Sequence, residues 1–232
     1  GDRIALLLGN QIEFVYCFLA AARLGLISVP MNTRQRRAEV SFALNQCGAA
    51  ALVFAAEHAD AVPAAGEIAT VRHFFRVGEG DGANFPELLR PGQIPGDWPM
   101  PASEDTLCLL YTSGTTGKPK GARLTNVSAV HSVLHYAEAF ELREGDTSML
   151  AVPISHVTGI VAILLATVHV AGCMVLLPAF KARTFLELAA AWRINFTLLV
   201  PAMYNLTLLD PGFASFDLSA WRVAGFGGAP MP

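Results

Sequence analysis

The chain has 232 residues, enough for one large domain or two small ones with a sizeable apolar core. Hydrophobic residues make up 53% of it and charged residues 15%, with a mean hydropathy of +0.44, which is more apolar than an average soluble domain. The net charge is −3 and no basic run exceeds Arg36-Arg37, so the sequence lacks the basic footprint of a nucleic-acid-binding protein, and no nucleic acid is expected as a partner.

The first 77 residues alternate short apolar runs with stretches of helical spacing. Asn10 is placed to cap a helix that runs toward Gly25, with Glu13 returning the bond, and a second helix is expected over Arg36–Gln46, closed by Gly48. Strands are expected around these helices, over Ile4–Leu8, Leu26–Pro30 and Ala50–Phe54. Strands joined by helix-sized connections are typical of parallel pairing, so the predicted fold class is α/β, with mostly parallel sheets flanked by helices.

From Gly78 to Asp105 the sequence turns to Gly, Pro and acidic residues without sustained periodicity, which predicts a connector over the surface. We therefore divide the chain into a first α/β portion at residues 1–77, a connector at 78–105 and a second α/β portion at 106–232. The second portion is expected to contain further strands and helices in alternation, with strands over Leu107–Tyr111, Met149–Val152, Phe196–Val200 and Arg222–Ala224, and helices over Asn126–Phe140, Thr184–Trp192 and Met203–Leu209.

Val157–Leu177 contains no formally charged residue and is long enough, at about 20 residues, to cross a bilayer. Gly159 and Gly172 interrupt the stretch, His169 lies inside it, and its last residues before Pro178 have the character of a short buried strand. A buried helix, a glycine stop and a buried strand are therefore preferred, and no transmembrane span is predicted.

The four cysteines are far apart in apolar surroundings, without a C-x-x-C pair or a histidine cluster that would indicate a metal site. We interpret them as buried thiols in a reducing compartment. The first residues carry no signal-peptide pattern and no initiator Met, so a cytoplasmic location is expected, and the chain is expected to start partway into a protein.

One loop carries the chemistry. The segment Tyr111–Gly121, Tyr-Thr-Ser-Gly-Thr-Thr-Gly-Lys-Pro-Lys-Gly, follows an apolar strand and brings four serine and threonine hydroxyls, three glycines and two lysines together. Glycines let backbone N–H groups approach an anion, hydroxyls add donors, and lysine adds positive charge, so the composition fits a triphosphate cradle. An exposed turn would have similar composition. A Walker A loop is excluded by the spacing and by Pro119 after Lys118.

This loop resembles the signature of the acyl-CoA synthetase, adenylation-domain and firefly-luciferase superfamily of adenylate-forming enzymes, and the match continues through Leu124-Thr-Asn126. The resemblance implies that Lys120 assists catalysis and that Thr115 is the one candidate for contact with a metal. It also implies a set of ATP-phosphate-binding residues, namely Thr112, Ser113, Gly114, Thr115, Thr116, Gly117, Lys118 and Lys120.

Two later segments agree with the family in order. Val152–Gly159 resembles the second signature, which implies that His156 lies at the acyl and carboxylate pocket, although a lone histidine there would otherwise be interpreted as a core or helix-capping residue. The second segment resembles the part that passes the adenine and the acyl pocket, and it consists of Gly227, Gly228, Ala229 and Pro230.

The resemblance implies an ATP-dependent acid–thiol ligase of the acyl-CoA ligase branch. A carboxylic acid, with a fatty acid as the preferred candidate, would attack the α-phosphate of ATP. CoA would then accept the acyl group, and Mg²⁺ would assist. The chain is expected to be an incomplete N-terminal domain, since the family's later glutamate, ribose-binding aspartate and C-terminal catalytic lysine have no counterpart in it. We therefore expect it to be inactive alone.

Three alternatives stay open. An amino-acid adenylation domain would place an aspartate after the second signature to pair with the substrate ammonium, but Val157–Leu177 holds no Asp or Glu. A non-catalytic family member would act as a binding module, which the intact loop with Lys118 and Lys120 argues against. A membrane protein is the third, and it depends on Val157–Leu177 alone. Separately, homo-oligomer formation is expected, because the apolar content predicts exposed apolar surface.

Overall fold

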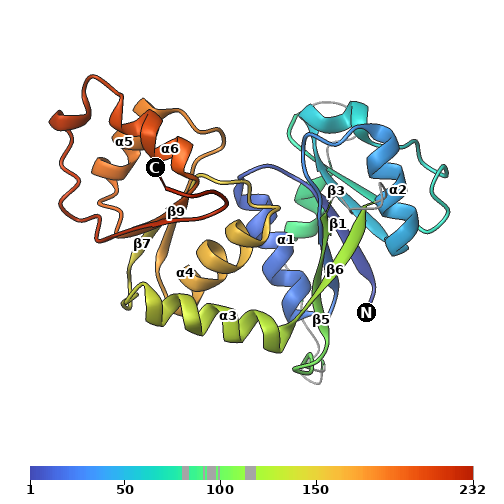
Figure 1. Ribbon diagram of the computed structural model, residues 1–232. Coiled ribbons are helices and arrows are strands. Elements are labelled where there is room, and N and C mark those ends of the chain that lie inside the picture. Colours follow the sequence, from blue (N-terminus) through green and yellow to red (C-terminus); the bar gives the residue numbers. More distant parts are fainter. Residues whose placement is uncertain (80–83, 91, 93–97, 99, 113–118, 232) are drawn as a thin grey trace. The chain divides into compact units, whose positions relative to one another are not determined.

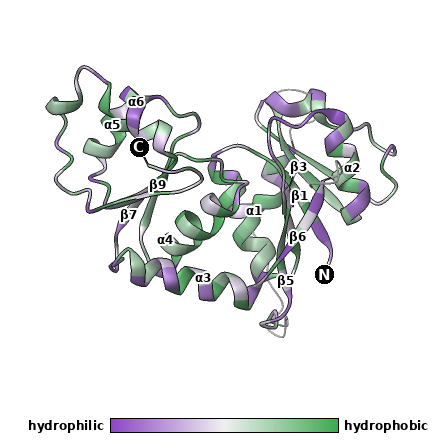
Figure 2. Ribbon diagram, viewed as in Figure 1, coloured by the Kyte–Doolittle hydropathy of each residue, from purple (hydrophilic) through white to green (hydrophobic). Residues whose placement is uncertain are grey.

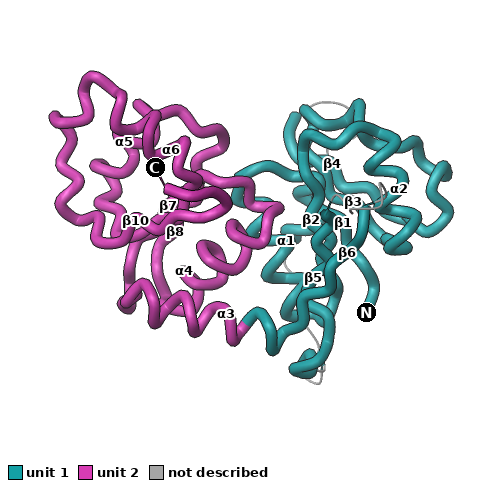
Figure 3. Tube along the Cα trace, viewed as in Figure 1, with its two compact units in different colours: residues 1–129 teal, residues 130–232 magenta. Residues whose placement is uncertain are grey.

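A computed structural model describes residues 1–79, 84–90, 92, 98, 100–112 and 119–231. The chain is α/β and forms two compact units, residues 1–129 and 130–232 (Figures 1 and 3). The boundary falls within helix α3 (Asn126–Ala139). The division at residues 78–105 that the sequence suggested stays a prediction.

The first unit is built on a six-stranded sheet with the order β4-β3-β1-β2-β5-β6. Strands β1 to β5 are parallel and β6 is antiparallel to β5. Their bounds are Arg3–Leu7 for β1, Ile27–Pro30 for β2, Ala51–Ala55 for β3, His73–Val77 for β4, Thr106–Thr112 for β5 and Lys120–Thr125 for β6. Strands β1, β2, β3 and β5 match the predicted ones, while β4 and β6 were not predicted.

Two helices and two short 3₁₀ segments accompany this sheet, over Ile12–Arg23 (α1), Arg37–Cys47 (α2), Ala56–Ala61 (η1) and Phe85–Leu89 (η2). The predicted cap at Asn10 is wrong by one position, because the N-cap residue is Gln11 and its Nε2 donates to Glu13 Oε2 at 3.1 Å. The stop at Gly48 is confirmed, since this residue has a φ of +62° that L side chains rarely adopt. Segment η2 lies inside the predicted connector, which is therefore not wholly irregular.

The core of this unit lies where β1 to β3 meet α2. Leu7, Leu44 and Leu52 are fully buried there, and each large apolar side chain that leaves water stabilises the fold by about 1.5–3 kcal/mol. Helices α2 and α3 carry both hydrophilic and hydrophobic residues along their length, as expected of helices with one covered face (Figure 2).

The second unit is built on a four-stranded, all-parallel sheet with the order β10-β9-β7-β8. The strands are Thr147–Leu150 (β7), Cys173–Leu176 (β8), Phe196–Leu199 (β9) and Val223–Phe226 (β10). Strand β9 is buried along its whole length, as expected of a strand in a parallel sheet with covered faces. The connecting segments are Ala182–Ala191 (α5), Pro201–Leu208 (α6) and the 3₁₀ turn Phe213–Ser215 (η4).

The uncharged stretch forms a helix, a turn and a strand, as predicted. A π-helix (η3, Thr158–Leu165) continues into α4 (Ala166–His169), and the chain turns at Gly172 to enter β8. A Cβ at Gly172 would collide with the backbone oxygen of Asp146, so glycine is required for the turn. In the part of the chain that the structure describes, no helix combines the length and apolarity that a membrane crossing needs.

Burial of the cysteines only partly follows the prediction. Cys17 and Cys108 are buried and Cys47 is half-buried, but Cys173 is exposed. Strand β8 lies at the edge of its sheet, so its first residue lacks the cover that a central strand receives. The expected burial of Cys173 is therefore wrong, although all four thiols are free.

The two sheets repeat one connectivity. In each, the first strand is central, the second lies on one side of it, the third lies on the other side and the fourth follows the third, giving β4-β3-β1-β2 and β10-β9-β7-β8. In the first unit, the connections that leave β1 and β3 therefore run toward opposite edges of the sheet, so they diverge between these two strands. In the second unit, the connections that leave β7 and β9 diverge in the same way. Ligand crevices of open α/β sheets form at such divergence points, beyond the carboxyl ends of the strands.

Candidate functional site

In the second unit, two of the predicted site segments lie at one edge of the sheet. Residues 151–157, which include His156, follow β7, and Gly227–Pro230 follows β10. Strand β9 lies between them and is followed by Val200. Because neighbouring parallel strands end at the same edge, the fold collects these segments beyond the carboxyl ends of the strands, next to the divergence of β7 and β9.

His156 is exposed at the start of the η3 helix. Its Nδ1 accepts a hydrogen bond from the Thr158 backbone N–H at 3.3 Å and lies 3.2 Å from Thr158 Oγ1. Its carbonyl accepts from the Ile160 N–H at 3.0 Å. The imidazole thus accepts the backbone N–H of the first helical residue, and with Nδ1 as acceptor the neutral ring carries its proton on Nε2, which remains a donor. This local hydrogen bond and a role at a substrate are compatible for this side chain.

Gly159 allows the helix to pack on the loop that precedes it. A Cβ at this position would lie 2.6 Å from the Pro153 carbonyl oxygen and 2.8 Å from Ile154 Cα. His156 N donates to that same Pro153 oxygen at 3.1 Å. The loop is thus folded tightly against the first turn of the helix, which holds the imidazole at the exposed end.

The Gly227–Pro230 segment leaves the sheet at its last ladder bond, in which Gly227 N donates to Leu199 O at 3.2 Å. Gly228 has a φ of +82°, a conformation in which glycine is the unstrained choice. Gly228, Ala229 and Pro230 are exposed. This segment therefore offers backbone polar groups and little side chain at the edge of the sheet.

The predicted phosphate loop connects β5 and β6 of the first unit. Thr112 and Lys120 are paired in register at the loop end of this antiparallel pair, and both side chains are exposed. The other predicted phosphate-binding residues lie outside the described residues, namely Ser113, Gly114, Thr115, Thr116, Gly117 and Lys118. The structure thus places the two ends of the loop and leaves the roles of its residues as predictions.

Tyr111 anchors this hairpin to its own sheet. Its hydroxyl donates to Ala43 O on α2 at 3.4 Å, and its ring packs on Gly121, where a Cβ would lie 3.5 Å from the ring. Burial, and secondarily the neighbouring Cys47, raises the pKa of the Tyr111 phenol to about 12. The hydroxyl therefore remains a hydrogen-bond donor at neutral pH.

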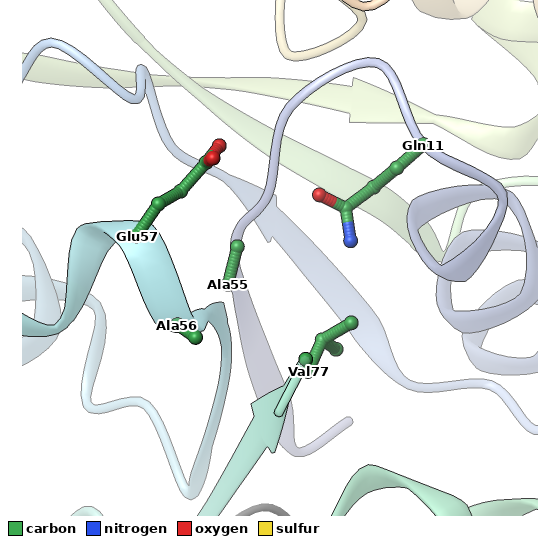
Figure 4. Close-up of a pocket in the computed structure, with 6 residues that line it drawn as sticks. Gln11, Ala55, Ala56, Glu57 and Val77 are labelled. Carbon is green, nitrogen blue, oxygen red and sulfur yellow. The ribbon is translucent and has the colours of Figure 1, made fainter. Parts of the chain in front are cut away.

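A shallow cavity of about 300 Å³ in the first unit was not predicted from the sequence. It lies at the divergence of β1 and β3, and it is lined by Gln11, Ala55, Ala56, Glu57, Val77 and Gly78 (Figure 4). The side chains of Gln11 and Glu57 provide its polar groups. None of its lining residues belongs to a recognisable motif, so only the topology of the sheet could have indicated it.

Metal ligands are not gathered in the part of the chain that the structure describes, where no group of three His, Cys, Asp or Glu side chains could hold an ion. Thr115, the one metal candidate from the sequence, lies outside that part.

Known proteins are similar to this chain in sequence and fold. A long-chain-fatty-acid–CoA ligase (FadD13) of Mycobacterium tuberculosis is 32% identical over 237 residues, and a feruloyl-CoA synthase of Amycolatopsis sp is 33% identical over 233 residues. The matches cover all of this chain but 46% and 45% of those proteins, so the chain spans just under half of their length.

The inhibitor-bound N-terminal domain of FACL13 from Mycobacterium tuberculosis superimposes with a TM-score of 0.88 at 33% identity. This alignment covers the whole chain and 58% of that domain. The profile of one family, described as AMP-binding enzyme, matches residues 1–232. The chain therefore belongs to the AMP-binding enzyme family, as its loop signature indicated.

Proposed function

We propose that the protein containing this chain is an ATP-dependent acyl-CoA ligase, which activates a carboxylic acid as an acyl-adenylate and transfers the acyl group to CoA. The observation that carries the proposal is the arrangement in the second unit. There the His156 loop and the Gly227–Pro230 segment, which are far apart in the sequence, reach one edge of one parallel sheet. Both segments match the family in type and order.

The described residues have distinct roles in this proposal. His156 presents Nε2–H at the free end of a helix, where a donor and the positive end of the helix dipole favour a carboxylate. Gly227 and Gly228 allow a flat ligand to approach the backbone closely. Lys120 brings positive charge to the end of the β5–β6 hairpin, where it would offset charge on the phosphates of ATP.

Mg²⁺ would neutralise phosphate charge in such a reaction. The described residues contain no group of three candidate metal ligands. This chain can supply one part of catalysis, namely the positioning of the acid and of ATP. Its hydrogen-bond donors would point at the charge that develops in the reaction.

The apolar helix beyond His156 favours an uncharged acyl tail. Ile160, Val161 and Ile163 are at most 2% exposed, and Val157–Leu177 has no acidic residue to pair with an amino-acid ammonium. A buried ammonium without a partner is costly, so an amino-acid substrate is disfavoured. We propose a fatty acid as substrate, with an aryl acid as the alternative, since the relatives include enzymes named for each.

The proposal is tested on the product of the complete open reading frame. It is incubated with Mg-ATP and a panel of fatty, aryl and amino acids, with and without CoA, and pyrophosphate, AMP and acyl-CoA are measured. We expect acyl-CoA from fatty or aryl acids. We also expect a loss of about 100- to 1,000-fold in kcat/KM for Lys120→Ala, the range found when one charge-stabilising donor is removed, while the exposed Lys181→Ala remains near wild type.

Absence of pyrophosphate with every acid would favour the non-catalytic alternative. The 232-residue chain, tested in the same assay, is expected to give no turnover, and robust adenylation by it would contradict that expectation.

We further propose a cytoplasmic location, which the four free thiols support.

A further inference from the structure

The position of the Gly227–Pro230 segment depends on strand β10, and β10 is weakly held by its own side chains. In the described part of the chain, β10 has β9 as its one strand partner and lies at the edge of the sheet. Its residues alternate between half-buried and exposed, and Gly225, in its second half, has no side chain to pack. Other groups must therefore fix the end of the strand from which the segment departs.

The Tyr204 hydroxyl is one such group. It lies on α6 and donates to the Gly225 carbonyl at 2.7 Å, two residues before Gly227. On Gly225 itself, the ring of Phe140 is packed so closely that a Cβ there would lie 2.9 Å from Phe140 Cζ. The Gly225 backbone is thus held both by a hydrogen bond and by an aromatic ring.

Tyr204 is itself held in place. Its ring stacks on Trp221 with the ring centroids 6.1 Å apart and an interplanar angle of 24°. The Trp221 ring in turn packs against the fully buried Phe185 of α5, with the ring centroids 5.4 Å apart. Trp221 Nε1 also donates to Val223 O at 2.8 Å, at the start of β10. Burial raises the pKa of the Tyr204 phenol far above its usual range, so the hydroxyl stays a donor at any pH at which an enzyme works.

We propose that Tyr204 is a positioning residue for substrate binding. Its hydroxyl fixes the carboxyl end of β10 and thereby holds Gly227–Pro230 where a ligand meets it. This inference rests on the function proposed above, in which that segment lines the acyl and adenine pocket. Tyr204 need not touch the substrate, since it acts through the backbone at Gly225.

The test is Tyr204→Phe in the full-length protein, which removes the hydroxyl and keeps the ring. One hydrogen bond changes an equilibrium by roughly 2- to 10-fold. We expect KM for the acid or for ATP to rise by that factor with kcat nearly unchanged. We also expect amide hydrogen exchange in peptides covering 223–231 to become faster by the same factor. Tyr16→Phe, on an exposed tyrosine of α1, is the matched control and should change neither quantity.

Gly225→Ala gives a second, independent approach. The added methyl group would clash with the Phe140 ring that packs on Gly225, and so disturb the same stretch of backbone without changing Tyr204. It should raise KM and accelerate exchange at 223–231 as Tyr204→Phe does. Unchanged exchange in Tyr204→Phe would overturn the proposal, and so would faster exchange with an unchanged KM. If the wild-type protein activates no acid at all, the proposed function fails, while the exchange measurement still reports whether Tyr204 holds the segment.

Discussion

Three neighbouring residues illustrate how a short motif combines structure with a potential role in binding. Thr158 supplies the N–H that His156 Nδ1 accepts at the start of the helix, and Gly159 lets the helix touch the preceding loop. The hydrogen bond orients the imidazole and selects the tautomer with its proton on Nε2. The same contacts that stabilise the helix therefore prepare a hydrogen-bond donor at its exposed end.

Gly159→Ala tests how tightly this loop is packed. The new methyl group would meet backbone atoms of Pro153 and Ile154 that cannot rotate away, so we expect a loss of about 1–3 kcal/mol in the free energy of unfolding. Urea denaturation followed by circular dichroism measures it. Gly9→Ala, where an added Cβ meets nothing within 4 Å, is the control and should be close to neutral. Equal losses in both variants would contradict the close approach.

The cysteines offer a second test at this scale. Cys173 is exposed, whereas burial raises the pKa of Cys17 and of Cys108 to about 12, with Glu13 adding a smaller effect at Cys17. A thiol-specific reagent at pH 8 should therefore modify Cys173 first, and the other two only on unfolding, because the thiolate is the reactive form. Cys173→Ser should remove the fast phase. Rapid labelling of Cys17 or Cys108 in this variant would show that these buried thiols are accessible.

At the scale of elements, an ion pair joins the start of β10 to the turn before β7. Arg222 Nη2 lies 2.5 Å from Asp146 Oδ2, and the Arg143 backbone N–H donates to the same oxygen at 2.8 Å. The side chains are 26% and 8% exposed. Such a pair is more shielded from water than a surface pair, so removing one partner leaves a poorly solvated charge.

We expect Arg222→Met to lower the free energy of unfolding by about 1–3 kcal/mol, as for hydrogen bonds that involve a charged group. Arg72→Met breaks a pair with Asp2 in which both side chains are more than 60% exposed, so its cost should be about 0–1 kcal/mol. Thermal unfolding of both variants compares them directly. A larger loss for Arg72→Met would contradict the importance assigned to burial.

The strands that were missed share a physical cause. Strand β6 contains Lys120, Gly121 and Arg123 and is mostly exposed, so it lacks the apolar run that identifies a buried parallel strand. It forms because its backbone pairs with β5 at the edge of the sheet. Strand β4 also lies at an edge, and Arg76 interrupts its apolar residues. Edge strands depend on partners from elsewhere in the chain, which periodicity does not reveal.

At the scale of the whole molecule, buried acids make stability sensitive to alkaline pH. The pKa is raised to about 12 for both Tyr111 and Cys108, mainly by burial, from ordinary values of about 10 and about 8.5. A raised pKa means that the folded state keeps protons that the unfolded state loses. Each such group therefore makes its full contribution to the free energy of unfolding below its unfolded pKa. That contribution is lost as the pH rises toward the folded pKa.

The midpoint of urea unfolding should accordingly be steady from pH 7 to about pH 8.5 and fall as the pH approaches about 12. Measurements at half-unit intervals of pH test this. Cys108→Ala removes one of these groups, while Cys17 and Tyr111 keep their raised pKa values, so its curve should fall less steeply with pH than the wild-type curve. A midpoint that rises with pH over this window would contradict the assigned direction.

The repeated connectivity of the two sheets has no counterpart in a visible sequence repeat. Each unit places a divergence of connections at the carboxyl edge of its sheet, and the two locations differ in chemistry. The second unit places His156 and Gly227–Pro230 at this edge, whereas the first places the small cavity lined by Gln11 and Glu57 there. Topology thus indicates where ligands could bind, and only the local residues decide which ligands.

The sequence by itself determined the α/β class, the family and the chain order of the site segments. Those properties depend on local signals, namely apolar runs, glycine stops and the Tyr111–Gly121 signature. Only the tertiary structure decided that Cys173 is exposed and that Tyr204 holds Gly225. The physical reason is that these properties depend on strand order and on contacts between residues distant in sequence, which residue spacing does not encode.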